Sequence, residues 1–202
     1  MTSAEFEQFE YLFSKAEKLL DLRLGGEAVK GVRGVTRLVE AKLNLPSISD
    51  QFDAAVRSFF GMRPDQLSVI LDEALCESVL VLGVTALEVY LRQVREHLGK
   101  RNLGLLENIS ALKAWSKATG IDPFRAVSGD ELNQAFQWRH IIVHSGGKVD
   151  SKAMANGLKN VKEGDQARNK LTPSYTSDLL TVIKSVAESV DRQYSELQRL
   201  GT

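Results

Sequence analysis

The residues of this chain best suited to chemistry stand together in the stretch 139–147, RHIIVHSGG, where Arg139 is followed five positions later by His144. An imidazole gains or loses a proton near neutral pH, and a guanidinium can make two parallel hydrogen bonds to phosphate oxygens. These groups suit acid–base chemistry on a phosphate ester, such as attack of a ribose 2′-hydroxyl on the adjacent phosphorus. That reaction needs neither a metal ion nor a cofactor, and we predict none.

These residues are expected on one amphipathic helix. Ser128 followed by Glu131 has the capping-box spacing that begins a helix, and the glycine pair at 146–147 is a stop signal. At about 100° per residue, Arg139 lies within about 20° of the centre of an apolar stripe. The members of this stripe are Leu132, Ala135, Phe136 and Val143.

A guanidinium at such a position needs a partner. Arginine does not lose its proton on burial, so it must be paired, hydrogen-bonded or placed at a cavity that an anion enters. Glu88, charged within an apolar stretch of an earlier helix, is the candidate ionic partner for Arg139. The alternative for Glu88 is an exposed helix charge.

The spacing from Arg139 through the polar His140 to His144 resembles the HEPN superfamily, whose ribonucleases carry an arginine, four to six residues that begin with a polar one, and a histidine. The stretch 143–150, VHSGGKVD, is similar to the RiboL-PSP type of HEPN domain. Two further stretches, ALEVYL at 86–91 and LTPSY at 171–175, look like the same family. The resemblance covers roughly residues 66–198.

This resemblance implies an all-α, antiparallel helical bundle and a homodimer that cuts RNA through Arg139 and His144. A second His144 from a symmetry-related copy would then supply the acid or base that one histidine cannot. His140 would support the site, and the products would be a 2′,3′-cyclic phosphate and a 5′-hydroxyl. A toxin or defence effector, restrained by an antitoxin or regulatory protein, is the biological role implied.

Other interpretations of the same residues stay open. His140 and His144 have the i, i+4 spacing of zinc ligands, but no glutamate follows His140 and no third ligand is evident. Ser145 beside His144 lacks a nucleophile-elbow motif, which favours a hydroxyl at a helix end. Arg139 and His144 could also be a buried pair that fixes helix packing in a non-catalytic RNA-binding or protein-interaction module.

Charge points to a local rather than a global surface for nucleic acid. The chain has 26 basic and 26 acidic residues, so no overall field favours a polyanion. The segment from residue 139 to 170, however, contains seven basic and only three acidic residues. We predict RNA contacts here, above all at Lys148 and Lys152, the alternative being a solvated loop.

Composition also limits the setting of the protein. Cys76 is the only cysteine, which excludes a disulfide framework and a thiolate metal cluster and favours a reducing, cytoplasmic setting. No window approaches about 18 uninterrupted apolar residues and the start is acidic, so we expect neither a membrane span nor a signal peptide.

Apolar residues recur every three or four positions, which predicts an all-helical protein. We divide it into an N-terminal helical extension, 1–64, and a HEPN-like helical domain, 65–202. Expected helices cover 3–24, 29–45, 49–60, 65–98, 105–118 and the motif segment, and Thr172 with Pro173 begins the last one. The core face of the longest helix is predicted to carry Ile70, Leu71, Leu75, Val79, Leu82, Leu87, Tyr90, Leu91 and Val94.

Overall fold

The computed structural model describes residues 3–21, 64–100, 106 and 108–200, and this part of the chain is all-α. Its only β-type pairing is an isolated bridge between Lys148 and Gln166. The helices are α1 (Ala4–Asp21), α4 (Pro64–His97), α5 (Ile109–Thr119), α6 (Gly129–His144), α7 (Ser151–Ala155), α8 (Ala167–Lys170) and α9 (Pro173–Leu200). The predicted helices at 29–45 and 49–60 lie outside the described residues.

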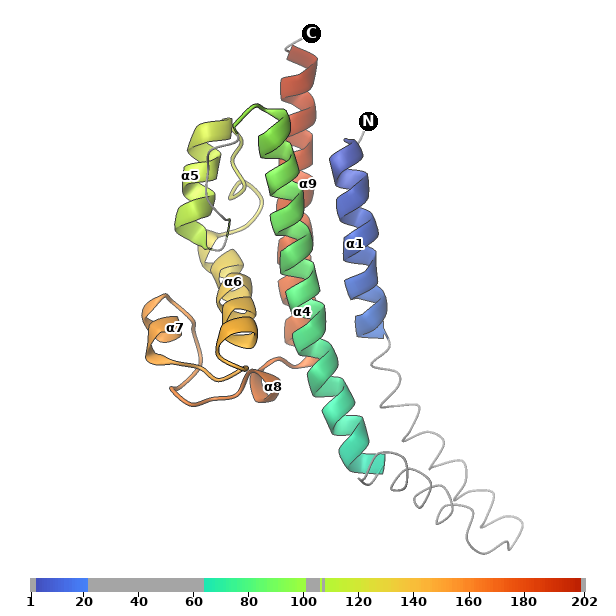
Figure 1. Cartoon of the computed structure of the whole chain (residues 1–202), viewed down its shortest axis with the longest axis vertical. Coiled ribbons are helices and arrows are strands. Elements are labelled where there is room, and N and C mark those ends of the chain that lie inside the picture. Colours follow the sequence, from blue (N-terminus) through green and yellow to red (C-terminus); the bar gives the residue numbers. More distant parts are fainter. Residues whose placement is uncertain (1–2, 22–63, 101–105, 107, 201–202) are drawn as a thin grey trace, which may run out of the picture.

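Helices α4 and α9 form the centre of the bundle, with α1 packed on one side and α6 on the other (Figure 1). α4 and α9 run in the same direction, while α1 and α6 run opposite to them. α5 stands beside the α6 side of the bundle, and Trp115 on it donates its indole N–H to the carbonyl of Leu91 on α4, 3.0 Å away. The core therefore lies along α4, which packs against α1, α6 and α9.

The close contact between α4 and α9 depends on Gly83. A Cβ atom built at Gly83 would lie 2.6 Å from Leu180 Cδ2 and 3.5 Å from Ile183 Cδ1, both on α9. It would also lie 3.5 Å from Phe13 on α1. Because real carbon atoms do not approach so closely, a side chain at 83 would force the end of the Leu180 side chain to move and would crowd Ile183 and Phe13.

α1 is held to the bundle by an aromatic row and by a buried polar contact. Phe6, Phe9 and Phe13 are buried and point toward α4, where Phe6 and Phe9 contact the ring of Tyr90 at centroid distances of 5.8 and 5.6 Å. At the start of α1, Ser3 donates its hydroxyl to buried Asp191 on α9 at 2.6 Å and its backbone N–H at 3.2 Å. α1 thus shares the core of the later helices, while the division at residue 64 stays a prediction.

The signals that begin α6 and α9 are confirmed. Ser128 accepts from the backbone of Glu131, and the Glu131 carboxylate accepts from Ser128, so the capping box of α6 is complete. Thr172 Oγ1 likewise accepts from the backbone N–H of Tyr175 where α9 begins. The long helix predicted at 65–98 is α4, and the one predicted at 105–118 is α5, which begins later, at Ile109.

Two predictions of core position are wrong. Leu82 was assigned to the core face of α4 and is 41% exposed, and Val143 was assigned to the apolar stripe of α6 and is 48% exposed. Both helices have apolar residues on more than one side, so the pattern did not decide which side meets the core. The other described members of the two sets are buried or partly buried. The side chains of Ile70 and Leu71 lie outside the description.

Short helices α7 and α8 were not predicted, because five and four residues are too few to show a helical period. Both belong to the loop that joins α6 to α9 at the lower end of the bundle in Figure 1. None of the helices, so far as the chain is described, is long and apolar enough to cross a membrane.

Candidate functional site

The ion pair between Arg139 on α6 and Glu88 on α4 is at the centre of the candidate site. Arg139 Nη2 lies 3.5 Å from Glu88 Oε2, and the two side chains are 19% and 11% exposed. The two residues meet where α4 and α6 pack side by side in opposite directions. The predicted pairing is therefore present, and Glu88 is not the exposed helix charge that was the alternative.

This single contact leaves most of the Arg139 guanidinium available. Arginine has five N–H donors, and the one hydrogen bond of this guanidinium to the described residues, to Glu88, is long at 3.5 Å. Its Nε is buried and has no hydrogen-bond partner within the described structure. A guanidinium with so few hydrogen bonds can bind an anion without first breaking strong hydrogen bonds within the protein.

The two histidines of the motif lie side by side at the end of α6. Their ring centroids are 4.8 Å apart and the rings are tilted by 45°. His140 is partly buried, while His144 is the last residue of the helix and is exposed. Partial burial lowers the pKa of His140, and the neighbouring charges of His144, Lys152 and Arg139 lower it further against the opposing effect of Asp150.

The glycine pair ends α6 and turns the chain sharply back. Gly146 and Gly147 have φ angles of +58° and +80°, and the N–H of Gly147 returns to the carbonyl of Ile141 at 3.1 Å. The left-handed backbone explains why glycine is required here. A Cβ atom at Gly147 would also lie 3.2 Å from Glu77 Oε1 on α4, so this turn is seated against the neighbouring helix.

After the turn, Val149 and Asp150 attach the following loop. Val149 is buried, its N–H donates to Asp165 O at 2.8 Å, and its carbonyl accepts from Gly164 N at 2.9 Å. The Asp150 carboxylate accepts from Ala153 N at 2.7 Å and so caps α7. The resemblance to the VHSGGKVD pattern thus falls on residues with clear structural roles in the turn and the loop.

The structure does not bring Arg139 and His144 into contact within one chain. Five positions along an ideal α-helix rotate a side chain by about 140°, so the two groups point to different sides of α6. Arg139 faces α4 and Glu88, whereas His144 is exposed at the end of α6. His140 stands between the two directions.

The basic loop is partly neutralised. Lys159 Nζ pairs with Asp130 Oδ2 at 2.7 Å, and Lys170 Nζ pairs with Asp165 Oδ2 at 3.0 Å. Lys148 and Lys152 are exposed and make no ion pair with any residue that the structure describes. Part of the cationic charge that remains for a polyanion therefore lies near His140, at Lys152, while Lys162 and Arg168 carry the rest farther along the loop.

Within the described ranges no cluster of three or more His, Cys, Asp or Glu side chains could hold a metal ion. Ser145, considered as a hydrolase nucleophile, is the C-terminal cap of α6, and its N–H donates to Ile141 O at 2.9 Å. These observations favour the helix-end interpretation of Ser145.

Sequence reasoning missed a polar cavity at the other end of α6. Asn133 and Gln137 contribute to its wall together with the start of α5 and Asn156 after α7. Asn133 donates to the carbonyl of Asn156 at 2.7 Å, and Gln134 donates to that of Gly157 at 2.8 Å. The run of amide side chains at 133, 134 and 137 is the signal that a search for hydrogen-bonding residues would have found.

No family model, no curated protein and no solved structure matches this chain.

Proposed function

We propose that this protein is a metal-independent endoribonuclease of HEPN type, which cleaves RNA by attack of a 2′-hydroxyl with Arg139 and His144 as its catalytic residues. The observation that carries the proposal is the state of Arg139, a mostly buried guanidinium with one long contact and an unsatisfied Nε. A phosphate group would supply the missing hydrogen-bond acceptors. The proposal also rests on the resemblance of the sequence to HEPN ribonucleases, and a role as toxin or defence effector rests on that resemblance alone.

Arg139 and His144 would have different roles in the reaction. Arg139 would bind the non-bridging oxygens of the phosphate as negative charge builds on them. His144 would remove the proton of the attacking 2′-hydroxyl or donate a proton to the leaving 5′-oxygen. The partly buried His140, whose pKa is lowered, would stay neutral near pH 7 and orient its neighbour through the ring contact. Lys148 and Lys152 would bind flanking phosphates.

A homodimer would complete this site. Arg139 and His144 point in different directions within one chain. One histidine also cannot readily act as both acid and base in one step, so a second copy would bring a second His144 to the phosphate. Exposed Val143 on α6 lies one helical turn after Arg139, and exposed Leu82 on α4 lies about two turns before Glu88. The opposite directions of α4 and α6 place both apolar side chains at the same level. Val143, about 40° from Arg139 around α6, is the exposed apolar side chain next to the ion pair that a second copy could cover.

The test is incubation of the purified protein with single-stranded RNA in excess chelator, beside the variants Arg139→Ala and His144→Ala. Matched controls are Arg92→Ala, an exposed arginine on α4, and His97→Ala, the histidine at the far end of α4. The proposal predicts cleavage by the parent and both controls, and at least hundredfold slower cleavage by the two motif variants. Equal cleavage by all five folded proteins, or none by the parent, contradicts it.

The second candidate is a non-catalytic RNA-binding or protein-interaction module of HEPN type, in which an antitoxin or regulatory protein is one possible partner. One observation favours it: Arg139 already has an ionic partner across the α4–α6 contact, as a packing residue would. This candidate predicts that Arg139→Ala lowers stability and that the folded parent binds RNA or its partner protein without cutting RNA.

A further inference from the structure

A second site lies along α6, away from the motif. Asn133, Gln137, His140 and His144 are four, three and four positions apart, so they fall within about 60° of one another around the helix. On this face of α6, Asn133 and Gln137 line the polar cavity, and the two histidines follow toward the end of the helix. Gln137 lies about 10 Å from His144 along the helix axis, at about 1.5 Å per residue.

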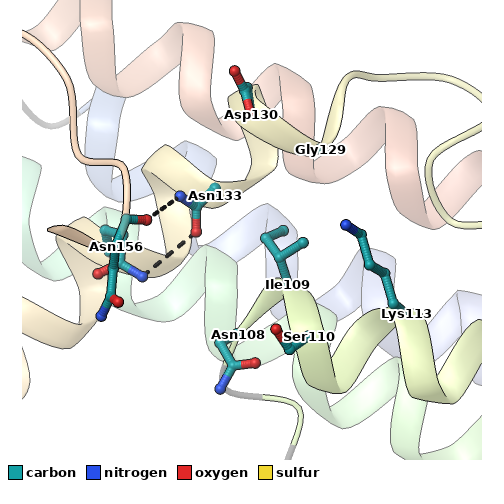
Figure 2. A pocket seen from close by; sticks show the side chains of 9 residues that line it. Asn108, Ile109, Ser110, Lys113, Gly129, Asp130, Asn133 and Asn156 are labelled. Atoms are coloured by element: carbon teal, nitrogen blue, oxygen red, sulfur yellow. Dashed lines mark hydrogen bonds between the residues drawn. The ribbon is translucent and has the colours of Figure 1, made fainter.

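The cavity is large enough for a nucleobase. It measures about 450 Å³, which is within the usual range of small-ligand sites. Figure 2 shows Asn108, the N-cap of α5, and Lys113 of α5 on one wall, with Asn133 of α6 and Asn156 across from them. Seven of the nine residues that line the cavity have polar or charged side chains.

Gln137 is the feature that points to a ligand. It is only 7% exposed, lines the cavity, and makes one long hydrogen bond, from its Nε2 to Asn133 Oδ1 at 3.5 Å. Its Oε1 accepts no hydrogen bond from the described residues. This oxygen is not enclosed by protein atoms, so an incoming N–H donor can reach it from the cavity and take the place of water.

The charges around the cavity suit a nucleotide rather than a cation. Asp130 is already paired with Lys159 at 2.7 Å, and this contact keeps the pKa of Asp130 below its usual range. Lys113 is exposed and has no ion pair with any residue in the described ranges. A carbonyl acceptor and an ammonium group without an ion pair to the described residues line the same cavity, which fits a base with its phosphate.

We propose that this cavity binds one nucleobase of single-stranded RNA, with Gln137 accepting from the exocyclic amine of adenine, cytosine or guanine and Lys113 binding the adjacent phosphate. Uracil offers only its ring N3–H, flanked by two carbonyl oxygens that would repel Gln137 Oε1 while Nε2 is engaged with Asn133, so it would bind worst. The base would lie within about three nucleotides of the cleaved bond, since stacked nucleotides rise about 3.4 Å. The identity of the polymer as RNA rests on the proposed function.

The experiment measures binding of short oligoadenylate, oligocytidylate and oligouridylate by fluorescence anisotropy, in a His144→Ala parent that does not consume them. We expect the first two to bind about tenfold more tightly than oligouridylate. Gln137→Met, which keeps the side-chain volume, should bring this ratio close to one. Lys113→Ala should weaken all three about equally, by about three- to tenfold. The matched control, Lys117→Ala on the exposed side of α5, should change each dissociation constant less than about twofold.

The outcomes separate this site from the catalytic proposal. If the wild-type protein cleaves no RNA while the parent shows this base-dependent binding, the catalytic proposal fails and the nucleobase site stands. If RNA is cleaved and folded Gln137→Met keeps the same base preference, the nucleobase site fails and the catalytic proposal stands. Binding of none of the three oligonucleotides also overturns the nucleobase site.

A measurement without substitution covers the case in which Gln137→Met does not fold. Addition of oligocytidylate to the His144→Ala parent should shift the side-chain amide NMR signals of Gln137 and Asn156. The signals of Gln193, which lies away from the cavity on α9, should not move. Unchanged signals for Gln137 and Asn156 at saturating oligonucleotide contradict the proposal.

Discussion

Arg139 on α6 and Glu88 on α4 form a mostly buried ion pair, with 3.5 Å between Nη2 and Oε2, that joins the motif helix to the central helix of the bundle. The contact orients the guanidinium while occupying few of its donors. The ion pair therefore helps to pack α6 on α4. It also holds Arg139 in place with donors left to bind an anion. The two roles have different experimental consequences.

The packing role predicts that Glu88→Gln lowers the free energy of unfolding by about 1–3 kcal/mol, because a mostly buried guanidinium loses its charged partner. Glu17→Gln, which breaks an ion pair with Lys184 whose members are both exposed, should cost about 0.5 kcal/mol or less. Denaturant unfolding measures both. A loss no greater for Glu88→Gln than for Glu17→Gln would show that the ion pair does not stabilise the packing of α6 on α4.

The histidine pair predicts a defined response of His140. Loss of the positive charge of His144 in His144→Ala should raise the pKa of His140, and Lys152→Ala should raise it less. Asp150→Asn keeps a side chain that can cap α7 but removes a negative charge, so it should lower the pKa of His140 further. NMR titration of the imidazole signals measures all three. Shifts in the opposite directions would contradict the described arrangement.

The same lowered pKa makes stability depend on pH. The folded protein holds the His140 proton less tightly than the unfolded chain, so the unfolded state binds more protons. The contribution of His140 to stability is therefore complete above about pH 6.5, the ordinary pKa of histidine, and is lost as the pH falls toward the lower folded-state value. His140→Gln should reduce the fall in unfolding free energy between about pH 7 and 5, and a fall as steep as in the parent would argue against this origin.

The turn after α6 predicts different costs for two adjacent glycines. Gly146→Ala places a side chain in a left-handed conformation with nothing within 4 Å of its Cβ, and should cost about 1 kcal/mol. Gly147→Ala adds a contact of 3.2 Å with Glu77 Oε1, so it should cost about 2 kcal/mol or more. Thermal unfolding of the two variants gives the comparison. Equal losses would mean that Glu77 moves away without cost.

The proposed dimer predicts that a charge at Val143 separates the copies. Val143→Asp should sediment as a monomer and lose RNA cleavage while its helical content is unchanged, because a desolvated carboxylate opposes association. Tyr11→Asp is the matched control, since Tyr11 is exposed on α1, on the other side of the bundle. A monomeric parent, or a Val143→Asp variant that keeps both the dimer and the activity, would exclude this surface as the interface.

The sequence predicted the elements that have strong local signals. The capping box at Ser128, the glycine pair at 146–147 and the Thr172-Pro173 start all mark helix ends in the structure. The pairing of Glu88 with Arg139 followed from the cost of burying a charge within an apolar stripe. Each of these predictions rests on the physics of a few neighbouring residues.

What the sequence did not reveal depends on how helices pack. Leu82 and Val143 are apolar, and only the placement of α4 against α6 decides that they face outward. The cavity around Gln137 joins α5, α6 and the segment after α7, which are separate in sequence. Helix geometry alone predicts that Arg139 and His144 point in different directions. The structure was needed to show that Arg139 points toward Glu88.

The most direct test of the central claim uses one RNA oligonucleotide and its twin with a single 2′-deoxynucleotide on the 5′ side of the mapped cleavage site, both incubated with the protein in excess chelator. The proposed mechanism predicts a 2′,3′-cyclic phosphate end on the cleaved RNA and no cleavage at that position in the twin, because the attacking hydroxyl is absent. Cleavage of the twin at the same bond, or no cleavage of either oligonucleotide by the folded protein, would contradict it.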